Sequence, residues 1–146
     1  MATTVTIPAL AAQLRVSVAR TARRLRQEGG ELSPTLAATL VTVERHGPLT
    51  PSELADRERI KRPTATRLVA RLEADGLVTR TADPADGRSA LIATTPAARA
   101  LLGEMRTRKD AFLTRRLRAL DAEDRAVLAR AAALLDRLLE DAEAEA

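Results

Sequence analysis

The chain has 146 residues, a length typical of one folding unit, and its 24 Lys and Arg against 20 Asp and Glu give a formal net charge of +4, which permits a nucleic-acid partner without requiring one. With no Cys and a single His, the composition excludes disulfides, a thiol nucleophile and a thiolate zinc site, and it argues against a His-ligated metal. Aromatic residues make up only 1% of the chain, so the core must consist of Leu, Val and Ala, which favours a mostly helical fold.

The N-terminus, Met1 to Thr4, lacks the basic residues that precede the apolar stretch of a signal peptide. No later run approaches the roughly 20 apolar residues of a membrane span. We therefore expect a cytoplasmic protein without a membrane partner.

Two amphipathic helices are predicted in the first third of the chain. Apolar residues recur at three- and four-residue spacings over residues 7–25, and Gly29-Gly30 ends this pattern. Ser33 and Pro34 then begin the second helix, because Ser is a favoured N-cap and Pro is tolerated at the first helical position. Gly47-Pro48 ends the second helix.

A closely spaced pair of helices follows. Thr50 can cap the helix of residues 52–58, and Glu53 completes a capping box with it. Residues 62–75 form the next helix, which Gly76 ends. Its inner face carries Ala65, Leu68, Val69 and Leu72, and its outer face carries Pro63, Arg67 and Ala70.

The residue pattern changes from helical to strand-like after Gly76. Residues 77–80 and 90–93 are strand-like and flank a turn-rich segment at residues 83–87, a pattern that predicts a β-hairpin. Two more helices follow, one over residues 95–120 and one that Asp121 caps. The last helix has a wide apolar stripe over residues 127–139, which needs another surface to cover it.

Two helices joined by a short turn and followed by a hairpin are typical of a winged helix-turn-helix. In this interpretation residues 52–58 support residues 62–75 in the major groove, and residues 77–93 are the wing. Reading bases needs donors on the outer face of the N-terminal end of the recognition helix, and phosphate binding needs flanking cations. The candidate donors are Arg62, Thr64, Thr66 and Arg67, with Arg67 the best candidate for base readout; the candidate flanking cations are Arg59, Lys61 and Arg71; Ser52 and Pro63 complete the predicted contacts on the two helices.

Arg88 follows the turn of the hairpin and lies two residues after Asp86. The spacing suggests that the Asp86 carboxylate orients the Arg88 guanidinium for insertion into a narrow minor groove. The alternative for Asp86 and Arg88 is a pair of opposite charges in a loop that has no function. The alternative for the arginines of residues 62–71 is an ordinary solvated helix face. His46, at the end of the second helix, is interpreted as a cap or packing residue.

Three groups of residues follow the pattern of one bacterial family. They are His46-Gly47-Pro48-Leu49-Thr50 with Glu53-Leu54-Ala55; Thr64 and Thr66-Arg67-Leu68-Val69 with Arg71-Leu72-Glu73 and Gly76-Leu77-Val78; and Asp83-Pro84 with Asp86 and Arg88. From Leu32 to Thr95 the chain therefore resembles the MarR family of bacterial transcriptional regulators. It departs from the family at Lys61, where a serine-type cap is common, and at Gly87, which replaces a second basic residue of the wing.

The resemblance implies a single unit over residues 1–146, with a DNA-binding region at residues 32–95 and a helical dimerisation region at residues 5–28 and 96–146. It implies a homodimer whose first and last helices intertwine, and a wing arginine and its orienting aspartate at Arg88 and Asp86. It further implies a repressor on a pseudo-palindromic operator, released by a small organic ligand that is phenolic or anionic. The residues of such a ligand site are unknown from the sequence, although an Arg such as Arg15 or Arg45 is expected among Leu, Val and Ala. No cofactor and no metal are expected.

Other functions are less well supported. The sequence does not support an enzyme, since it has no Gly-rich phosphate loop, no nucleophile paired with a base and no metal cluster. A winged-helix module that binds another protein instead of DNA is the remaining alternative, because a fold does not fix a function. Single-stranded RNA binding would need stacked aromatic side chains, and Phe112 lies far from the basic region.

Overall fold

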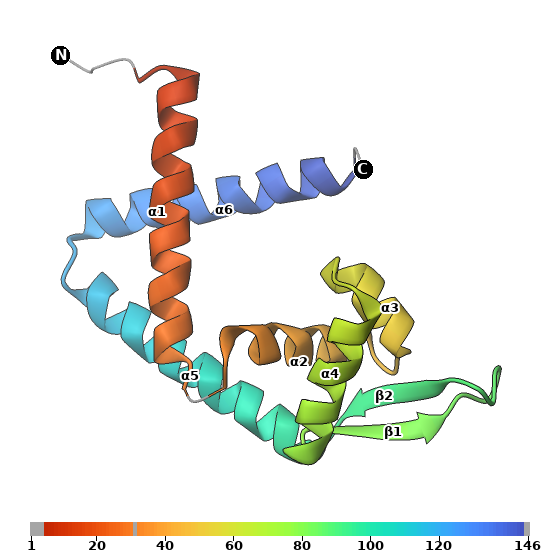
Figure 1. Cartoon of the computed structure of the whole chain (residues 1–146). Coiled ribbons are helices and arrows are strands. Elements are labelled where there is room, and N and C mark those ends of the chain that lie inside the picture. Colours follow the sequence, from red (N-terminus) through yellow and green to blue (C-terminus); the bar gives the residue numbers. More distant parts are fainter. Residues whose placement is uncertain (1–4, 31, 145–146) are drawn as a thin grey trace. The chain divides into compact units, whose positions relative to one another are not determined.

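The computed structural model describes residues 5–30 and 32–144, so Met1 to Thr4, on which the expectation of a cytoplasmic protein partly rests, lie outside the described residues. The elements follow in the order α1 (Ile7–Glu28), α2 (Pro34–His46), α3 (Pro51–Glu58), α4 (Arg62–Ala74), β1 (Val78–Ala82), β2 (Ala90–Thr94), α5 (Pro96–Arg118) and α6 (Ala122–Ala144) (Figure 1). The prediction of a mostly helical chain with one β-hairpin is confirmed. In the described ranges, no helix is both long and apolar enough to span a membrane.

The helices begin where the sequence places N-cap residues. Ser33 caps α2, and Thr50 and Glu53 form both hydrogen bonds of the predicted capping box at α3, at 3.2 and 2.7 Å. Thr95 caps α5, and Asp121 caps α6 by accepting from the Asp124 amide at 2.8 Å. These caps satisfy amides that the first turn of a helix leaves without partners.

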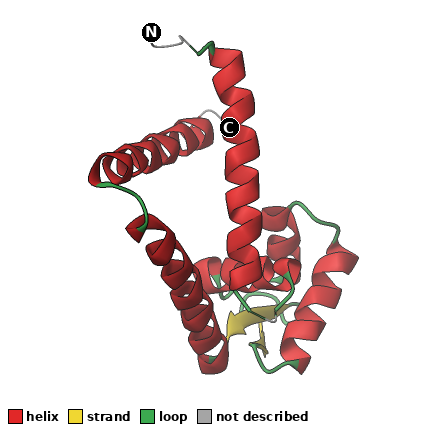
Figure 2. Ribbon diagram, turned by 90° about the vertical axis from the view of Figure 1, so that its left-hand side faces the viewer, coloured by secondary structure: helices red, strands yellow, loops and turns green. Residues whose placement is uncertain are grey.

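The chain divides into two compact units, Met1–Lys109 and Asp110–Ala146. The first unit contains α1 to α4, the hairpin and the N-terminal part of α5. Within it β1 packs against α4, and β2 packs against α2 and α3. Figure 2 shows the strands of the hairpin, in yellow, among the helices of this unit. The second unit contains α6 and the C-terminal end of α5. In this part of α5 the Arg116 guanidinium lies 5.3 Å from the centre of the Phe112 ring.

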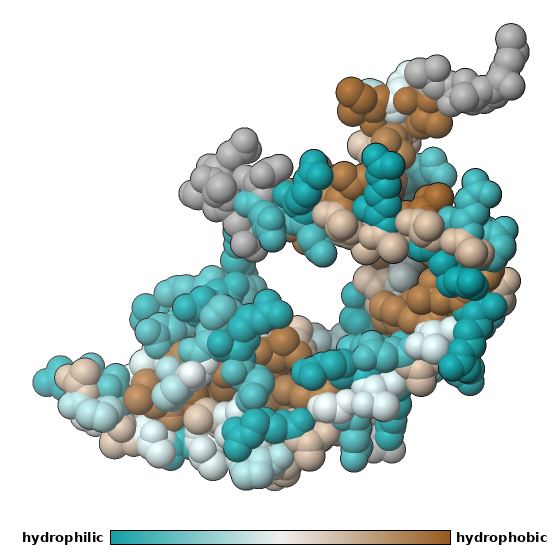
Figure 3. Space-filling view, turned by 180° about the vertical axis from the view of Figure 1, so that it is seen from behind, coloured by the Kyte–Doolittle hydropathy of each residue, from teal (hydrophilic) through white to brown (hydrophobic). Residues whose placement is uncertain are grey.

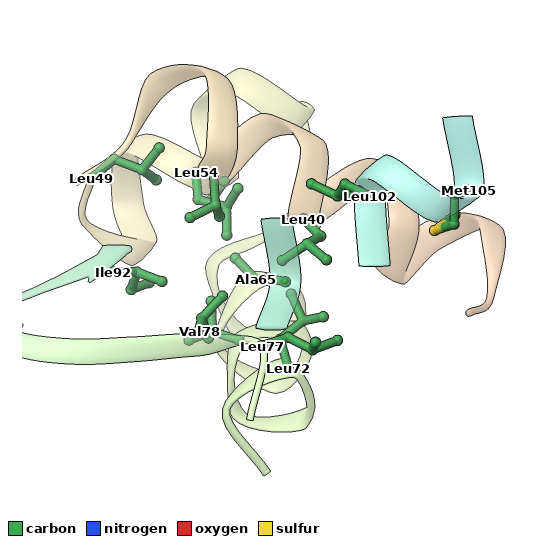
Figure 4. Packing of buried hydrophobic residues seen from close by; sticks show 14 residues of the cluster. Leu40, Leu49, Leu54, Ala65, Leu72, Leu77, Val78, Ile92, Leu102 and Met105 are labelled. Atoms are coloured by element: carbon green, nitrogen blue, oxygen red, sulfur yellow. The ribbon is translucent and has the colours of Figure 1, made fainter. Parts of the chain in front are cut away.

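One hydrophobic cluster holds the first unit together (Figure 4). Leu40, Leu54, Leu72 and Ile92 are fully buried in it and come from α2, α3, α4 and β2. Each buried side chain of this size contributes roughly 1.5–3 kcal/mol. The inner face predicted for α4 is confirmed, because Ala65, Val69 and Leu72 are buried and Leu68 is half-buried.

Apolar side chains of the terminal helices remain exposed. On α1 the Ile7 side chain is 85% exposed, and on α6 Val127, Leu138 and Leu139 are 61 to 66% exposed. Figure 3 shows hydrophobic atoms at the surface beside the N-terminal end of α1. Neither predicted stripe is fully covered within the described chain.

Candidate DNA-binding surface

A three-residue turn joins α3 to α4. Arg59 has a left-handed backbone conformation, with φ of 52°, and its amide donates to the Asp56 carbonyl at 3.2 Å. The Ile60 amide donates to the Ala55 carbonyl at 2.9 Å, and the Ile60 side chain packs against the core. The left-handed backbone conformation is unfavourable for a residue other than glycine, and the surrounding hydrogen bonds must offset this cost. The turn therefore fixes the direction in which α4 leaves α3.

The N-terminus of α4 has no side-chain cap. Lys61 occupies the N-cap position, and its carbonyl accepts from the amides of Thr64 and Ala65 at 2.9 and 3.1 Å. The positive end of the helix dipole therefore lies beside the exposed side chains of Lys61 and Arg62. Such an end is suited to a DNA phosphate.

The outer face of α4 carries Arg67 between Pro63 and Ala70, and all three residues are exposed as predicted. The short neighbours leave the Arg67 side chain room to extend. Thr66 is also exposed, but its hydroxyl donates to the Arg62 carbonyl at 3.0 Å, and Thr64 is half-buried. Arg62 and Arg67 are therefore the stronger donors of the four that the sequence predicts.

Arg71 differs from the other predicted phosphate contacts. Its Nε pairs with the Asp75 carboxylate at 3.0 Å, one turn further along α4. Both residues line a cavity of about 680 Å³ that Leu36 of α2 and Leu101 of α5 also line. A phosphate contact by Arg71 would have to compete with Asp75.

The wing is the antiparallel pair β1 and β2, in which Val78 lies opposite Thr94 and Ala82 opposite Ala90. Its base is attached to the helix-turn-helix through Leu49, which exchanges backbone hydrogen bonds with Ile92 at 3.1 and 2.8 Å. The hairpin therefore extends from the same core that holds α4.

Two aspartates brace the tip of the wing. Asp83 accepts from the Ala85 amide at 2.9 Å, and Asp86 accepts from the Arg88 amide at 3.0 Å. Short side chains that bind the backbone two residues on are a common means of fixing turns. The sequence predicts that Asp86 orients the Arg88 guanidinium, and this stays a prediction; in the structure the Asp86 carboxylate accepts from the Arg88 backbone amide.

Ser52 is half-buried in the first turn of α3, beside the capping box. Two hydrogen bonds with Thr50 lower the pKa of the Glu53 carboxyl below its ordinary value. The larger effect comes from the Thr50 amide, which donates to the Glu53 carboxylate, and the smaller from the Thr50 side chain. The beginning of α3 is thus held by a charged cap.

The predicted residues lie on four parts of the first unit. Ser52 lies on α3; Arg59 and Lys61 lie in the turn; Arg62, Pro63, Thr64, Thr66, Arg67 and Arg71 lie on α4; and Asp86 and Arg88 lie at the wing tip. The sequence reasoning missed the contact of Glu73 on α4 with Arg80 on β1, at 2.8 Å. The opposite charges on either side of the Gly76 turn were the available signal.

A second cavity, of about 640 Å³, adjoins the first, because Leu32 and Met105 line both. Its wall includes the apolar residues Leu32, Ala37, Ala38, Val41, Leu102 and Met105. Four cations also line it, namely Arg26, Arg45, Arg106 and Lys109, together with Glu44. Of the two arginines that the sequence offered as examples, Arg45 lines this cavity and Arg15 does not.

Glu44 connects this cavity to the base of the wing. The Thr94 hydroxyl, at the end of β2, donates to the Glu44 carboxylate. Arg99, in the first turn of α5, donates to the Thr94 carbonyl and hydroxyl oxygens at 3.3 Å. Residues 44 and 94 lie far apart in the sequence, so no local pattern predicts this contact.

Comparisons with known proteins agree with this architecture. The sequence pattern of the MarR family matches residues 32–90. An uncharacterised HTH-type transcriptional regulator of Mycobacterium leprae is 34% identical over 134 residues, which are 90% of this chain and 94% of that protein. A crystal structure of a putative transcriptional regulator from Pseudomonas aeruginosa has a TM-score of 0.81 at 36% identity and covers 89% of this chain and 93% of its own.

A mutant of MepR from Staphylococcus aureus, bound to an oligodeoxyribonucleotide, shares the fold with a TM-score of 0.67 at 20% identity. The match covers 90% of this chain and 96% of that one. The predicted winged helix-turn-helix and the resemblance to the MarR family are both confirmed.

Proposed function

We propose that this chain, which belongs to the MarR family of DNA-binding transcriptional regulators, acts as a homodimeric repressor that reads a pseudo-palindromic operator in the cytoplasm. The observation that carries the proposal is the pair of arginines exposed on two elements of one core, Arg67 on α4 and Arg88 at the wing tip. A regulator of this kind needs no catalytic site.

The helix α4 would enter the major groove with its uncapped N-terminus toward the DNA. Arg67 can donate two hydrogen bonds to the O6 and N7 atoms of a guanine, a contact worth roughly 1–3 kcal/mol of discrimination between bases. Lys61, Arg62 and Arg59 would bind phosphates and set the register of the helix. Arg88 would enter the adjacent minor groove, whose negative potential favours a guanidinium where the groove is narrow.

The exposed apolar stripes support the homodimer. Ile7 on α1 and Val127, Leu138 and Leu139 on α6 are among the most exposed large apolar residues of the described chain. Apolar patches of this kind mark association surfaces in otherwise polar proteins. A twofold dimer formed through residues 5–28 and 96–146 would place two DNA-binding regions, residues 32–95, on half-sites about 34 Å apart.

The cavity beside Glu44 and Arg45 is the proposed effector site. An apolar wall with several cations suits a small organic anion, phenolic or carboxylic, that keeps its apolar body out of water. Such a ligand releases DNA only if it binds the DNA-incompatible state more tightly, typically by about 1–3 kcal/mol. The link from Glu44 to Thr94 offers a route from the cavity to the wing.

Selection of bound sequences from a random duplex pool, at stated salt, tests the proposal. We expect an enriched motif with twofold symmetry, because two copies of α4 would read equivalent half-sites. A pool that shows no enriched motif would refute sequence-specific regulation and favour the alternative of a protein-binding module.

A further inference from the structure

An ion pair joins α4 to the wing. The Nε of Arg80, in β1, donates to Oε2 of Glu73, near the end of α4, at 2.8 Å. Of two further ion pairs, Arg24 with Glu28 lies within α1, and Arg71 with Asp75 joins α4 to its own C-cap residue. The Glu73–Arg80 pair therefore differs in kind, because it connects the two elements that we propose read the DNA.

The strand register explains how Arg80 reaches α4. Arg80 lies opposite Ile92 in the antiparallel pair, so their side chains are on the same face of the hairpin. That face begins at Val78, which is buried, and Ile92 is fully buried. Arg80 thus leaves the edge of the core on the face that packs against α4, and its side chain is only 32% exposed.

The corner between the two elements is fixed at its base by hydrogen bonds. The chain turns at Gly76, with φ of 72°, the Leu77 amide donates to the Leu72 carbonyl at 2.8 Å, and the Thr95 hydroxyl donates to the Gly76 carbonyl at 2.8 Å. Thr79, Thr81 and Ala82 of β1 are exposed. The Glu73–Arg80 pair is thus a contact between β1 and α4 that lies farther along the strand than the corner itself.

A small change of angle at this point has a large effect at the wing tip. Five strand residues extend roughly 16 Å, so a tilt of about 10° at the base displaces the far end by about 3 Å. A displacement of that size equals the length of a hydrogen bond. Contacts made by Arg88 are therefore sensitive to the angle at which the hairpin leaves α4.

We propose that Glu73 and Arg80 are positioning residues that set the wing at the angle at which Arg88 reaches the minor groove while α4 occupies the major groove. This inference rests on the proposed function. The pair also neutralises a carboxylate on the helix that approaches the phosphates. Because an exposed ion pair contributes little to folding, its main effect falls on DNA binding.

A double-mutant cycle tests the proposal. Affinity for the duplex selected by the wild-type protein is measured at fixed salt for Arg88→Ala, for Glu73→Gln, for Arg80→Gln and for each of the latter combined with Arg88→Ala. In the wild-type background we expect Arg88→Ala to weaken binding about tenfold. In either ion-pair variant the same change should weaken binding by no more than about twofold, because the arginine is already displaced.

Asp75→Asn is the matched control, since it breaks the ion pair between α4 and its C-cap residue and leaves the wing joined to the helix. In that background Arg88→Ala should still cost about tenfold. A cost of about tenfold in the Glu73→Gln and Arg80→Gln backgrounds as well would overturn the positioning role. An effect in Arg80→Gln but not in Glu73→Gln would also overturn it, because Arg80 would then act on the DNA directly.

The two proposals fail in different ways. If the wild-type protein selects no duplex, the proposed function fails and the positioning role fails with it. If the wild-type protein selects a duplex and Arg88→Ala acts equally in all backgrounds, only the positioning role fails. Thermal unfolding of each variant, expected within a few degrees of wild type, shows that the variants are folded.

Discussion

Asp86 holds Arg88 by its backbone, with the Asp86 carboxylate 3.0 Å from the Arg88 amide nitrogen. The Asp86 carbonyl accepts a second bond, from the Ser89 amide at 3.0 Å. Among residues 5–30 and 32–140, no ion pair engages the Arg88 guanidinium. The wing tip is therefore a fixed turn from which a free arginine extends.

This contact predicts different results for two substitutions of Asp86. Asp86→Asn keeps an oxygen that can accept from the Arg88 amide, so we expect DNA affinity within about twofold of wild type. Asp86→Ala removes the acceptor and loosens the turn, and we expect affinity to fall about five- to tenfold. Titrations with the selected duplex compare the two variants. Equal losses in both would show that the negative charge, and not the backbone bond, is what matters.

Arg67 should determine one base of each half-site. Arg67→Ala removes the guanidinium and should abolish the preference at one major-groove position, with a loss of roughly tenfold or more on the best duplex. Arg67→Lys keeps the charge without the two parallel donors, so it should retain affinity for phosphates and lose most of the preference. Selection with each variant measures this. An unchanged motif in Arg67→Ala would assign base readout to another residue.

The sequence predicts the helices of this fold well, because their beginnings are local. Ser33, Thr50 and Asp121 each bind an amide three residues on, and the buried face of α4 follows from helical periodicity. Contacts between distant residues are different. The contact of Thr94 with Glu44 depends on how the hairpin packs against α2, which no local pattern contains. The contact of Arg80 with Glu73 has a local signal in the opposite charges on either side of Gly76, but it forms because β1 packs against α4.

The same distinction applies to the candidate site. Residue type and spacing place Arg67 on the outer face of α4 and Arg88 after the turn, and both are exposed. The atom that Asp86 binds depends on the local turn conformation, which residue type and spacing do not specify. The pairing of Arg71 with Asp75, one helical turn away, follows the i,i+4 spacing that brings opposite charges together on a helix.

Replacing Thr39 or Thr42 with Val should change the free energy of unfolding in opposite directions. Thr39 is fully buried and its hydroxyl has no hydrogen-bond partner among the residues that the structure describes, whereas the Thr42 hydroxyl donates to Glu58. Thr39→Val replaces an unsatisfied hydroxyl with a methyl group and should raise the free energy of unfolding by about 1 kcal/mol. Thr42→Val should lower it by about 1 kcal/mol, because Glu58 loses its donor. Denaturant unfolding at one protein concentration checks both signs, and stabilisation by Thr42→Val would contradict the assignment.

The capping box of α3 predicts a pH dependence. Hydrogen bonds from Thr50 lower the pKa of Glu53 in the folded protein below its unfolded value. A lowered folded pKa adds stability above the unfolded pKa, and this stability is lost as the pH falls through the folded pKa. Glu53→Gln should therefore flatten the fall in unfolding free energy below about pH 5. Parallel curves for both proteins between pH 6 and pH 3 would show that Glu53 does not contribute.

Leu138 lies in the exposed apolar stripe of α6 and is 61% exposed. We therefore expect formation of the proposed homodimer to depend on this residue. Leu138→Glu should shift the protein from dimer toward monomer at micromolar concentration, because a carboxylate buried in an apolar interface is costly. Ala133→Glu is the matched control, because helical periodicity places residue 133 on the opposite face of α6. Sedimentation equilibrium measures both. A wild-type protein that is a folded monomer at this concentration would contradict the homodimer.

In the proposed complex, two copies of α4 and the wing read one duplex together. Hydroxyl-radical footprinting of the wild-type protein on its selected duplex tests it most directly. We expect two protected half-sites centred about 10 base pairs apart, or a multiple of one helical turn, each flanked by a minor-groove protection that Arg88→Ala removes. A single protected segment without twofold symmetry, or protection that Arg88→Ala leaves unchanged, would contradict the account.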